Sequence, residues 1–302
     1  MNEENLKHLK EVLSIPTMTW GEDLLINYLE EYCVKNGLIH SVDEIGNVYV
    51  TKGIAEMYPC VVAHTDTVHQ LVDMVVNEEM LPNAQGEIKL SLKAYREDDG
   101  SPTGIGGDDK AGVFICLKML EHFDNIKAFF PVAEETGCHG SSKADPEFFS
   151  NVGYAIQFDS TENDTMSLTL MGVKLFEDDS EFFTSVKDVI VEHGITNWYN
   201  HPYTDTMKLK ELFDFSCLNF AAGYYKYHTK DEYVVVDDVQ NTTDMAVKVI
   251  GILGEKKYTY NNKSLLSDGY SYESPYDYDD DSDNDNDDGD WVNDSGYSDV
   301  FM

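Results

Sequence analysis

Apolar positions recur every three or four residues in several stretches of the chain. Leu6, Leu9 and Leu13 share one helical face, and a second face runs over 24–32 and stops at Gly37, a residue suited to a left-handed helix end. The same period returns after a glycine-rich loop at 104–107, and again over 180–193 and 239–253. The pattern predicts two opening helices, a helix after the loop, a later helix and a closing helix.

Short apolar runs of strand length lie between these helices. They cover 38–42, 47–51, 60–63, 126–132, 154–158 and 218–222, and 71–96 is typical of a β excursion with a turn at 82–86. Strands that alternate with crossover helices form layered sheets. We therefore predict an α/β fold with three layers (α/β/α) and a mainly parallel mixed sheet.

The composition divides the chain into two parts. Of the 302 residues 42% are hydrophobic, enough for a core of ordinary size. After about Lys263 the sequence is rich in Asp, Asn, Ser and Tyr and has almost nothing aliphatic to bury. We predict a single folded domain over 1–262 and a disordered acidic tail over 263–302, which is a solubilising appendage or, alternatively, a partner-binding tail.

The net charge of −36 makes nucleic acid and anionic membrane surfaces poor partners. No apolar stretch approaches the roughly 20 residues that cross a bilayer, and the first residues are charged, unlike a signal peptide. The five cysteines are odd in number and form no Cys-x-x-Cys pair, which is typical of a reducing compartment. These features predict a cytoplasmic protein.

Acidic and imidazole side chains follow the predicted strands, where an open α/β sheet places its chemistry. The candidates are His64 with Asp66, Asp108, the pair Glu134 and Glu135, Asp159, and His228. Imidazole and carboxylate ligands without thiolate suit zinc, cobalt or manganese. A carboxylate can bridge two ions with its two oxygens, and Asp108 is the best candidate for that bridge.

Two ions about 3.5–4 Å apart need roughly five protein ligands if one is shared. His64, Asp108, Glu135, Asp159 and His228 supply that number.

Asp66, Glu134 and Glu135 have different expected roles. Asp66 lies on the same side of an extended chain as His64 and can accept the second N–H of the imidazole. Adjacent glutamates on an extended chain point to opposite sides, so we assign Glu135 to metal and Glu134 to the general base.

Each of these residues alone has an ordinary structural explanation, such as a solvated turn or a helix N-terminus that attracts carboxylates. The ordered set is what predicts a metal site. Cys138 could be a nucleophile, although a small buried residue is the commoner role. His69, His139 and His201 lie near the motifs, and His201 is the one of these most suited to contact a substrate.

The motifs resemble those of the co-catalytic zinc exopeptidases, with peptidase T, the tripeptide aminopeptidase, closest in wording. They are AHTDTV at 63–68, GGDDKAG at 106–112, EETG at 134–137 and YHT at 227–229, and the resemblance runs from about Ile15 to about Leu253.

The resemblance implies specific roles. His64, Asp108 and Asp159 would hold one Zn²⁺, and Asp108, Glu135 and His228 a second Zn²⁺, with Co²⁺ or Mn²⁺ as alternatives. Glu134 would activate the shared water and Asp66 would orient His64. The resemblance also implies a cis peptide bond after Asp108.

The chain departs from peptidase T in one respect. Those enzymes insert a lid and dimerisation domain of about a hundred residues, whereas only 68 residues separate Asp159 from His228 here. The lid should be absent, as in the single-domain zinc aminopeptidases, and no lid-mediated dimer is expected. Residues 203–206 also resemble a late segment of the single-domain zinc aminopeptidases. The donor that stabilises the oxyanion is left open, with Tyr203, Tyr224 and Tyr225 as candidates.

The sequence thus predicts a dinuclear zinc metallopeptidase, most simply an aminopeptidase acting on short peptides. Alternatives are an N-acyl amino-acid deacylase or carboxypeptidase using the same chemistry, and an inactive peptidase-like binding module. The candidate substrate contacts are His201, Tyr203 and Asp205.

Overall fold

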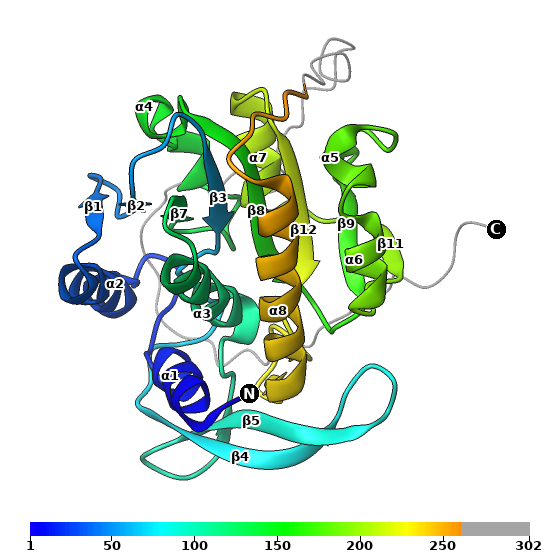
Figure 1. Ribbon diagram of the computed structural model, residues 1–302. Helices are drawn as coiled ribbons and strands as arrows, with labels where there is room; N and C mark the ends of the chain where they lie inside the picture. The colour runs from blue at the N-terminus through cyan, green and yellow to red at the C-terminus, as the bar shows by residue number, and fades with distance from the viewer. Residues whose placement is uncertain (261–302) are drawn as a thin grey trace, which may run out of the picture. The chain divides into compact units, whose positions relative to one another are not determined.

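A computed structural model describes residues 1–260 (Figure 1). Residues 261–302 are not described, so the predicted acidic tail over 263–302 lies outside the described residues. None of the described helices has the length and apolarity that a membrane span requires.

The main sheet has nine strands in the order β1-β2-β7-β3-β8-β12-β9-β10, and β11 pairs with β9. The strands are β1 (Ile39–Val42), β2 (Val48–Lys52), β3 (Tyr58–Val62), β7 (Ile126–Phe130), β8 (Val152–Ser160), β9 (Thr165–Leu170), β10 (Val173–Lys174), β11 (Asn197–His201) and β12 (Ser216–Ala221). The centre, β7-β3-β8-β12, is parallel, whereas β1, β2 and β9 join through antiparallel pairs. The predicted mixed sheet is therefore confirmed, with its parallel part at the centre.

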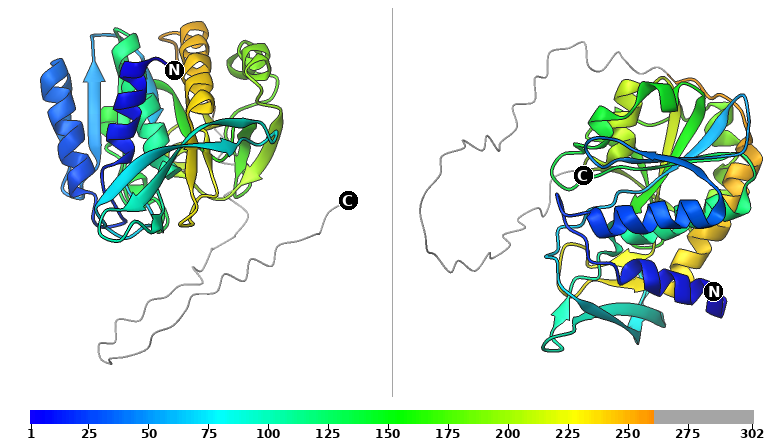
Figure 2. Two further views of the ribbon diagram at one scale, coloured as in Figure 1. Left: turned by 90° about the horizontal axis from the view of Figure 1, so that it is seen from below. Right: turned by 90° about the vertical axis from the view of Figure 1, so that its left-hand side faces the viewer.

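Helices cover both faces of this sheet, which gives the predicted three layers (Figures 1 and 2). On one face lie α3 (Gly107–His122) and α8 (Val236–Leu253), with α1 (Glu3–Leu13) against α3, and α7 (Asp205–Leu212) lies on the other. The remaining helices are α2 (Asp23–Asn36), α4 (Pro146–Phe149), α5 (Glu181–Thr184), α6 (Lys187–Glu192) and the 3₁₀ turn Ser141–Lys143. The apolar faces of the helices pack against the sheet and form a continuous hydrophobic core.

The helix predicted over 180–193 is in fact two short helices, α5 and α6. Hydroxyl side chains around the break bond to nearby backbone carbonyls: Thr184 donates to Ser180 O at 2.8 Å, and Ser185 donates to Phe182 O at 3.3 Å. Such local bonds compete with a continuous helix. The period of the apolar residues is kept across the break, so periodicity alone did not reveal it.

A second sheet is built on the predicted β excursion. Strands β4 (Met74–Pro82) and β5 (Ile88–Arg96) form a long hairpin, to which β6 (Pro102–Thr103), β14 (Tyr233–Val235) and β13 (Tyr224–Tyr225) are added. The sheet crosses below the helices in Figure 1. It fixes the loop between β13 and β14, and that loop carries His228.

The described chain contains no separate lid between Asp159 and His228. The strands of that interval, β9 to β13, all join one of the two sheets. The predicted absence of the lid is confirmed for this part of the chain.

Candidate metal centre

The predicted ligands come from separate elements and meet at the carboxyl ends of the central parallel strands. His64 follows β3, Asp159 is next to last in β8, Glu135 follows β7, and Asp108 opens α3. His228 comes from the loop between β13 and β14. This is the edge at which an open α/β sheet collects functional side chains.

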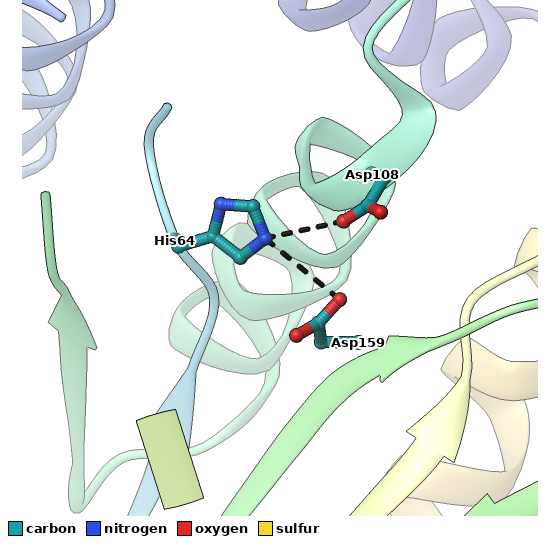
Figure 3. Close-up of side chains that lie close together, drawn as sticks. All are labelled: His64, Asp108 and Asp159. Atoms are coloured by element: carbon teal, nitrogen blue, oxygen red, sulfur yellow. Dashed lines mark hydrogen bonds and ion pairs between the residues drawn. The ribbon is translucent and has the colours of Figure 1, made fainter. Parts of the chain in front are cut away.

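One group contains His64, Asp108 and Asp159 (Figure 3). Nε2 of His64 lies 3.1 Å from Oδ1 of Asp108 and 3.8 Å from Oδ1 of Asp159. One ligand atom from each residue lies within 4.8 Å of the others, which is close enough for a single cation to contact all three.

A second group contains Asp108, Glu135 and His228, also within 4.8 Å of one another. Nε2 of His228 lies 3.3 Å from Oδ2 of Asp108 and 3.0 Å from Oε2 of Glu135. Asp108 thus turns Oδ1 toward the first group and Oδ2 toward the second. A carboxylate between two groups of ligands is the arrangement that a bridged pair of ions requires.

Glu134 and Asp66 lie beside the two groups without belonging to either. Oε2 of Glu134 is 4.0 Å from Nε2 of His64, and the side chain is buried. Asp66 accepts the backbone N–H of Glu134 at 2.9 Å, that of Glu135 at 3.2 Å, and the hydroxyl of Thr19 at 2.9 Å. Asp66 therefore fixes the turn that presents both glutamates.

The contact between Asp66 and His64 differs in detail from the expected one. Nδ1 of His64 lies 3.0 Å from the backbone carbonyl of Asp66 and 3.3 Å from Oδ1 of its carboxylate. The backbone oxygen is the nearer acceptor. Either acceptor leaves Nε2 free to face the two aspartates.

The crowded carboxylates change the electrostatics of the site. Burial raises the pKa of Glu135 to about 7 and raises the pKa of Glu134 well above its usual range. Burial alone would lower the pKa of His228, but its hydrogen bonds to Asp108 and Glu135 raise it to about 10. For Asp108, burial would raise the pKa, and the hydrogen bonds from the two histidines outweigh it and lower the pKa. Divalent cations bound here would stabilise the ionised form of these buried carboxyl groups.

The start of α3 is irregular. The peptide bond between Asp108 and Asp109 is cis, as the resemblance implies. Asp109 is buried and accepts the backbone N–H groups of Gly112 at 3.1 Å and His64 at 3.3 Å. A side chain at position 107 has no room, because a Cβ there would lie 2.7 Å from Val234. The glycine lets the loop pass tightly beneath the second sheet.

Sequence reasoning missed Glu232, whose carboxylate holds the loop before α3. It accepts the backbone N–H of Gly106 at 2.8 Å and that of Asp108 at 3.0 Å, and it lies 2.8 Å from Nε2 of His69. The side chain is fully buried. The available signal was an acidic residue just before the apolar run 233–236, in the same loop as His228.

Asp159 is also held by three residues to which sequence reasoning gave no such role. Its backbone N–H donates to Oδ1 of Asn219 at 2.9 Å, and its carboxylate accepts the hydroxyls of Thr204 and, at 3.2 Å, of Tyr224. These bonds fix the direction of the carboxylate.

A cleft of about 200 Å³ opens onto the two groups of ligands. His201 and Tyr203, two of the candidate substrate contacts, line it together with Tyr224. Asp205 does not line it; the side chain is buried at the start of α7, where it accepts from Gln157 at 3.0 Å. Tyr225 faces away from the cleft and donates to Asp238 at 2.7 Å.

The other residues near the motifs have structural surroundings. The five cysteines are buried and unpaired. Burial raises the pKa of Cys138, opposite to what a nucleophilic thiol needs. His69 is bound to Glu232, and the ring of His139 lies 5.5 Å from that of Trp20.

Comparison with known proteins places this fold. No family model and no curated protein matches the sequence. Solved structures do match: a tripeptidase from Staphylococcus aureus has a TM-score of 0.65 at 13% identity, over 84% of this chain and 99% of the other. Aminopeptidase PepT from Bacillus cereus gives 0.66 at 13% identity, over 83% and 98% of the two chains.

An aminopeptidase from the archaeon Desulfurococcus kamchatkensis gives a TM-score of 0.56 at 13% identity, over 83% of this chain and 98% of the other. The chain therefore has the α/β fold found in these exopeptidase structures. The resemblance of its motifs to exopeptidases is accompanied by a likeness in fold along most of the chain.

Proposed function

We propose that this chain is a dinuclear metal-dependent exopeptidase, an aminopeptidase that removes the N-terminal residue of short peptides. The observation that carries the proposal is the pair of ligand groups that share Asp108 through its two oxygens. The five candidate ligands are far apart in the sequence and lie close together in the structure. The fold that brings them together is like that of solved exopeptidases.

The donor set fits two divalent ions. His64, Asp108 and Asp159 would hold one, and Asp108, Glu135 and His228 the other. Two imidazoles and three carboxylates without sulfur suit zinc, with cobalt and manganese as alternatives. Ions of this kind, when bound, would lower the pKa of a water molecule and polarise the carbonyl of the amide.

The remaining residues supply proton transfer and orientation. Glu134 is buried beside His64 and is not needed as a ligand, so its carboxylate is available to take a proton from the attacking water and to pass it to the leaving nitrogen. Asp66 holds the backbone of both glutamates in place. A base that is fixed by hydrogen bonds loses little entropy when it acts.

The acidic character of the chain favours a free α-ammonium group over a free carboxylate. Two divalent ions would offset the carboxylates that line the cleft, but the chain as a whole carries a net charge of −36, so a cationic end of the substrate is attracted more than an anionic end. A volume of about 200 Å³ admits the end of a peptide rather than a folded chain.

The test combines metal analysis with a small substrate panel. Full-length protein incubated with zinc should retain two ions per chain, and it should hydrolyse aminoacyl-nitroanilides and unblocked tripeptides. Hydrolysis of N-acetylated substrates alone would overturn the aminopeptidase assignment in favour of a deacylase or carboxypeptidase. Protein that binds no metal and cleaves nothing would instead be a binding module.

A further inference from the structure

His201 ends strand β11 on the wall of the cleft. Its backbone is held by the parallel pairing of β11 with β9, and its carbonyl accepts the N–H of Met171 at 3.0 Å. The ring lines the same cleft as the two groups of ligands. A side chain on a paired strand keeps its position better than one on a loop.

A chain of hydrogen bonds runs from Asp159 toward His201. The backbone N–H of Asp159 donates to Oδ1 of Asn219 at 2.9 Å, which fixes the orientation of the Asn219 amide. The Nδ2 group must then be the donor on the other side. It donates to the backbone carbonyl of Asp159 at 2.9 Å and to Oγ of Ser167 at 3.1 Å.

The last link fixes the tautomer of the imidazole. Ser167 is fully buried, and its oxygen already accepts from Asn219. Nδ1 of His201, at 2.7 Å, is the remaining partner of this hydroxyl among residues 1–260. A buried hydroxyl proton requires an acceptor, so Ser167 donates to Nδ1. His201 therefore carries its own proton on Nε2.

Nε2 is the ring nitrogen of His201 that is available to a molecule in the cleft. Within the described part of the chain it has no hydrogen-bond partner, whereas Nδ1 lies 2.7 Å from Oγ of Ser167 and 3.4 Å from Oγ of Ser160. Burial lowers the pKa of His201, which favours the neutral ring with its single donor. The result is a fixed N–H donor on the wall of the cleft that holds the candidate ligands.

We propose that Nε2–H of His201 donates a hydrogen bond to the carbonyl oxygen of the scissile amide and stabilises the charge that develops there. This role rests on the proposed peptidase function. When the water oxygen bonds to the carbonyl carbon, its proton passes to Glu134 and the π electron pair moves to the carbonyl oxygen. On collapse that pair returns, the C–N bond breaks, and the leaving nitrogen takes the proton from Glu134. A preorganised donor acts at the moment when the oxygen is most negative.

With this assignment, the catalytic domain itself supplies a hydrogen-bond donor to the carbonyl oxygen, without a lid domain. Tyr203 and Tyr224 also line the cleft, but their hydroxyls already donate to Glu135 O at 3.3 Å and to Asp159 at 3.2 Å. His201 lies in the interval between Asp159 and His228 that is too short for a lid. Its donor role makes it a catalytic residue, and Ser167 and Asn219 are positioning residues.

The kinetic test uses the full-length protein loaded with zinc. His201→Phe keeps an aromatic ring and removes the donor, so kcat should fall about 100-fold with little change in KM. His201→Gln offers an amide N–H and should recover part of the loss. Ser167→Ala frees the tautomer and should cost only a few-fold. His40→Phe, at the far edge of the main sheet, is the matched control and should behave as the wild type.

A second readout does not depend on turnover. A long-range ¹H–¹⁵N NMR spectrum of the zinc-loaded protein, with the ring assigned by its absence in His201→Gln, should show the proton on Nε2. In Ser167→Ala the two nitrogens should become a mixture. Zinc content should be the same in all variants.

The outcomes separate the two claims. A proton on Nδ1 in the wild type, an active His201→Phe, or a rise in KM without loss of kcat would each overturn the donor role and leave the peptidase standing. A wild type that cleaves no peptide with zinc, cobalt or manganese would refute the proposed function and this role with it.

Discussion

Replacing Glu232 by glutamine tests whether one buried carboxylate positions Asp108, the candidate shared ligand. Its two oxygens accept three donors: the backbone N–H groups of Gly106 and Asp108, and the ring of His69. A glutamine has nearly the same shape but only one acceptor oxygen. Its NH₂ group must therefore face one of the N–H groups, which loses its partner in a site without water access.

The cost can be estimated from these bonds. An unsatisfied buried N–H costs about 1–3 kcal/mol, and the bonds that survive lose the assistance of a charged acceptor. We expect Glu232→Gln to lower the free energy of unfolding by about 2–4 kcal/mol. With a urea m-value of about 3 kcal/mol/M, the midpoint should fall by about 1 M. Because Asp108 moves with its backbone, metal affinity should fall about 10- to 100-fold.

The assay is urea unfolding of metal-free protein, followed by zinc titration of the folded variant. Glu78→Gln is the matched control: Glu78 is exposed and accepts a hydrogen bond from Lys10 at 3.2 Å, so its loss should change stability by less than about 1 kcal/mol. If Glu232→Gln unfolds at the same urea concentration as Glu78→Gln and binds zinc as the wild type does, the positioning argument is wrong.

Four further outcomes follow from the site. Glu134→Gln should reduce kcat by orders of magnitude while both metals stay bound, measured by steady-state kinetics and elemental analysis; loss of metal would make Glu134 a ligand. Chelation should abolish hydrolysis and lower the melting temperature, and zinc, cobalt or manganese should restore both. Asp66→Asn should place its NH₂ group against the N–H donor of either Glu134 or Glu135, which bond to different oxygens of Asp66, and lower stability by about 1–3 kcal/mol in urea unfolding, whereas Asp98→Asn on the surface should not. Truncation at about residue 264 should leave kcat/KM unchanged; a large loss would give the tail a catalytic role.

The candidate ligands that the structure brings together could be selected from the sequence because each belongs to a local pattern. His64, Glu135 and Asp159 directly follow or end apolar runs, and the ends of parallel strands meet at one edge of a sheet. Metal chemistry also restricts the residue types strongly. The order of these motifs carried information that no single motif had.

The positioning residues could not be predicted in the same way. Glu232, Asn219 and Ser167 act through hydrogen bonds to partners 126, 60 and 34 residues away, and nothing near them in the sequence marks those partners. The same holds for the second sheet, because β14 pairs with β5 from the first half of the chain. Long-range pairing depends on the whole fold, whereas periodicity reports only the local element.

The short interval between Asp159 and His228 explains how this chain can dispense with a lid. Its strands β9 and β11 extend the main sheet beyond β12, and their side chains His201 and Leu170 form part of the cleft wall. The wall that faces the candidate ligands is therefore built by the same chain that carries them. We expect a site built in this way to work without a second copy, so kcat per chain should stay constant as the protein is diluted through any dimer dissociation measured by ultracentrifugation.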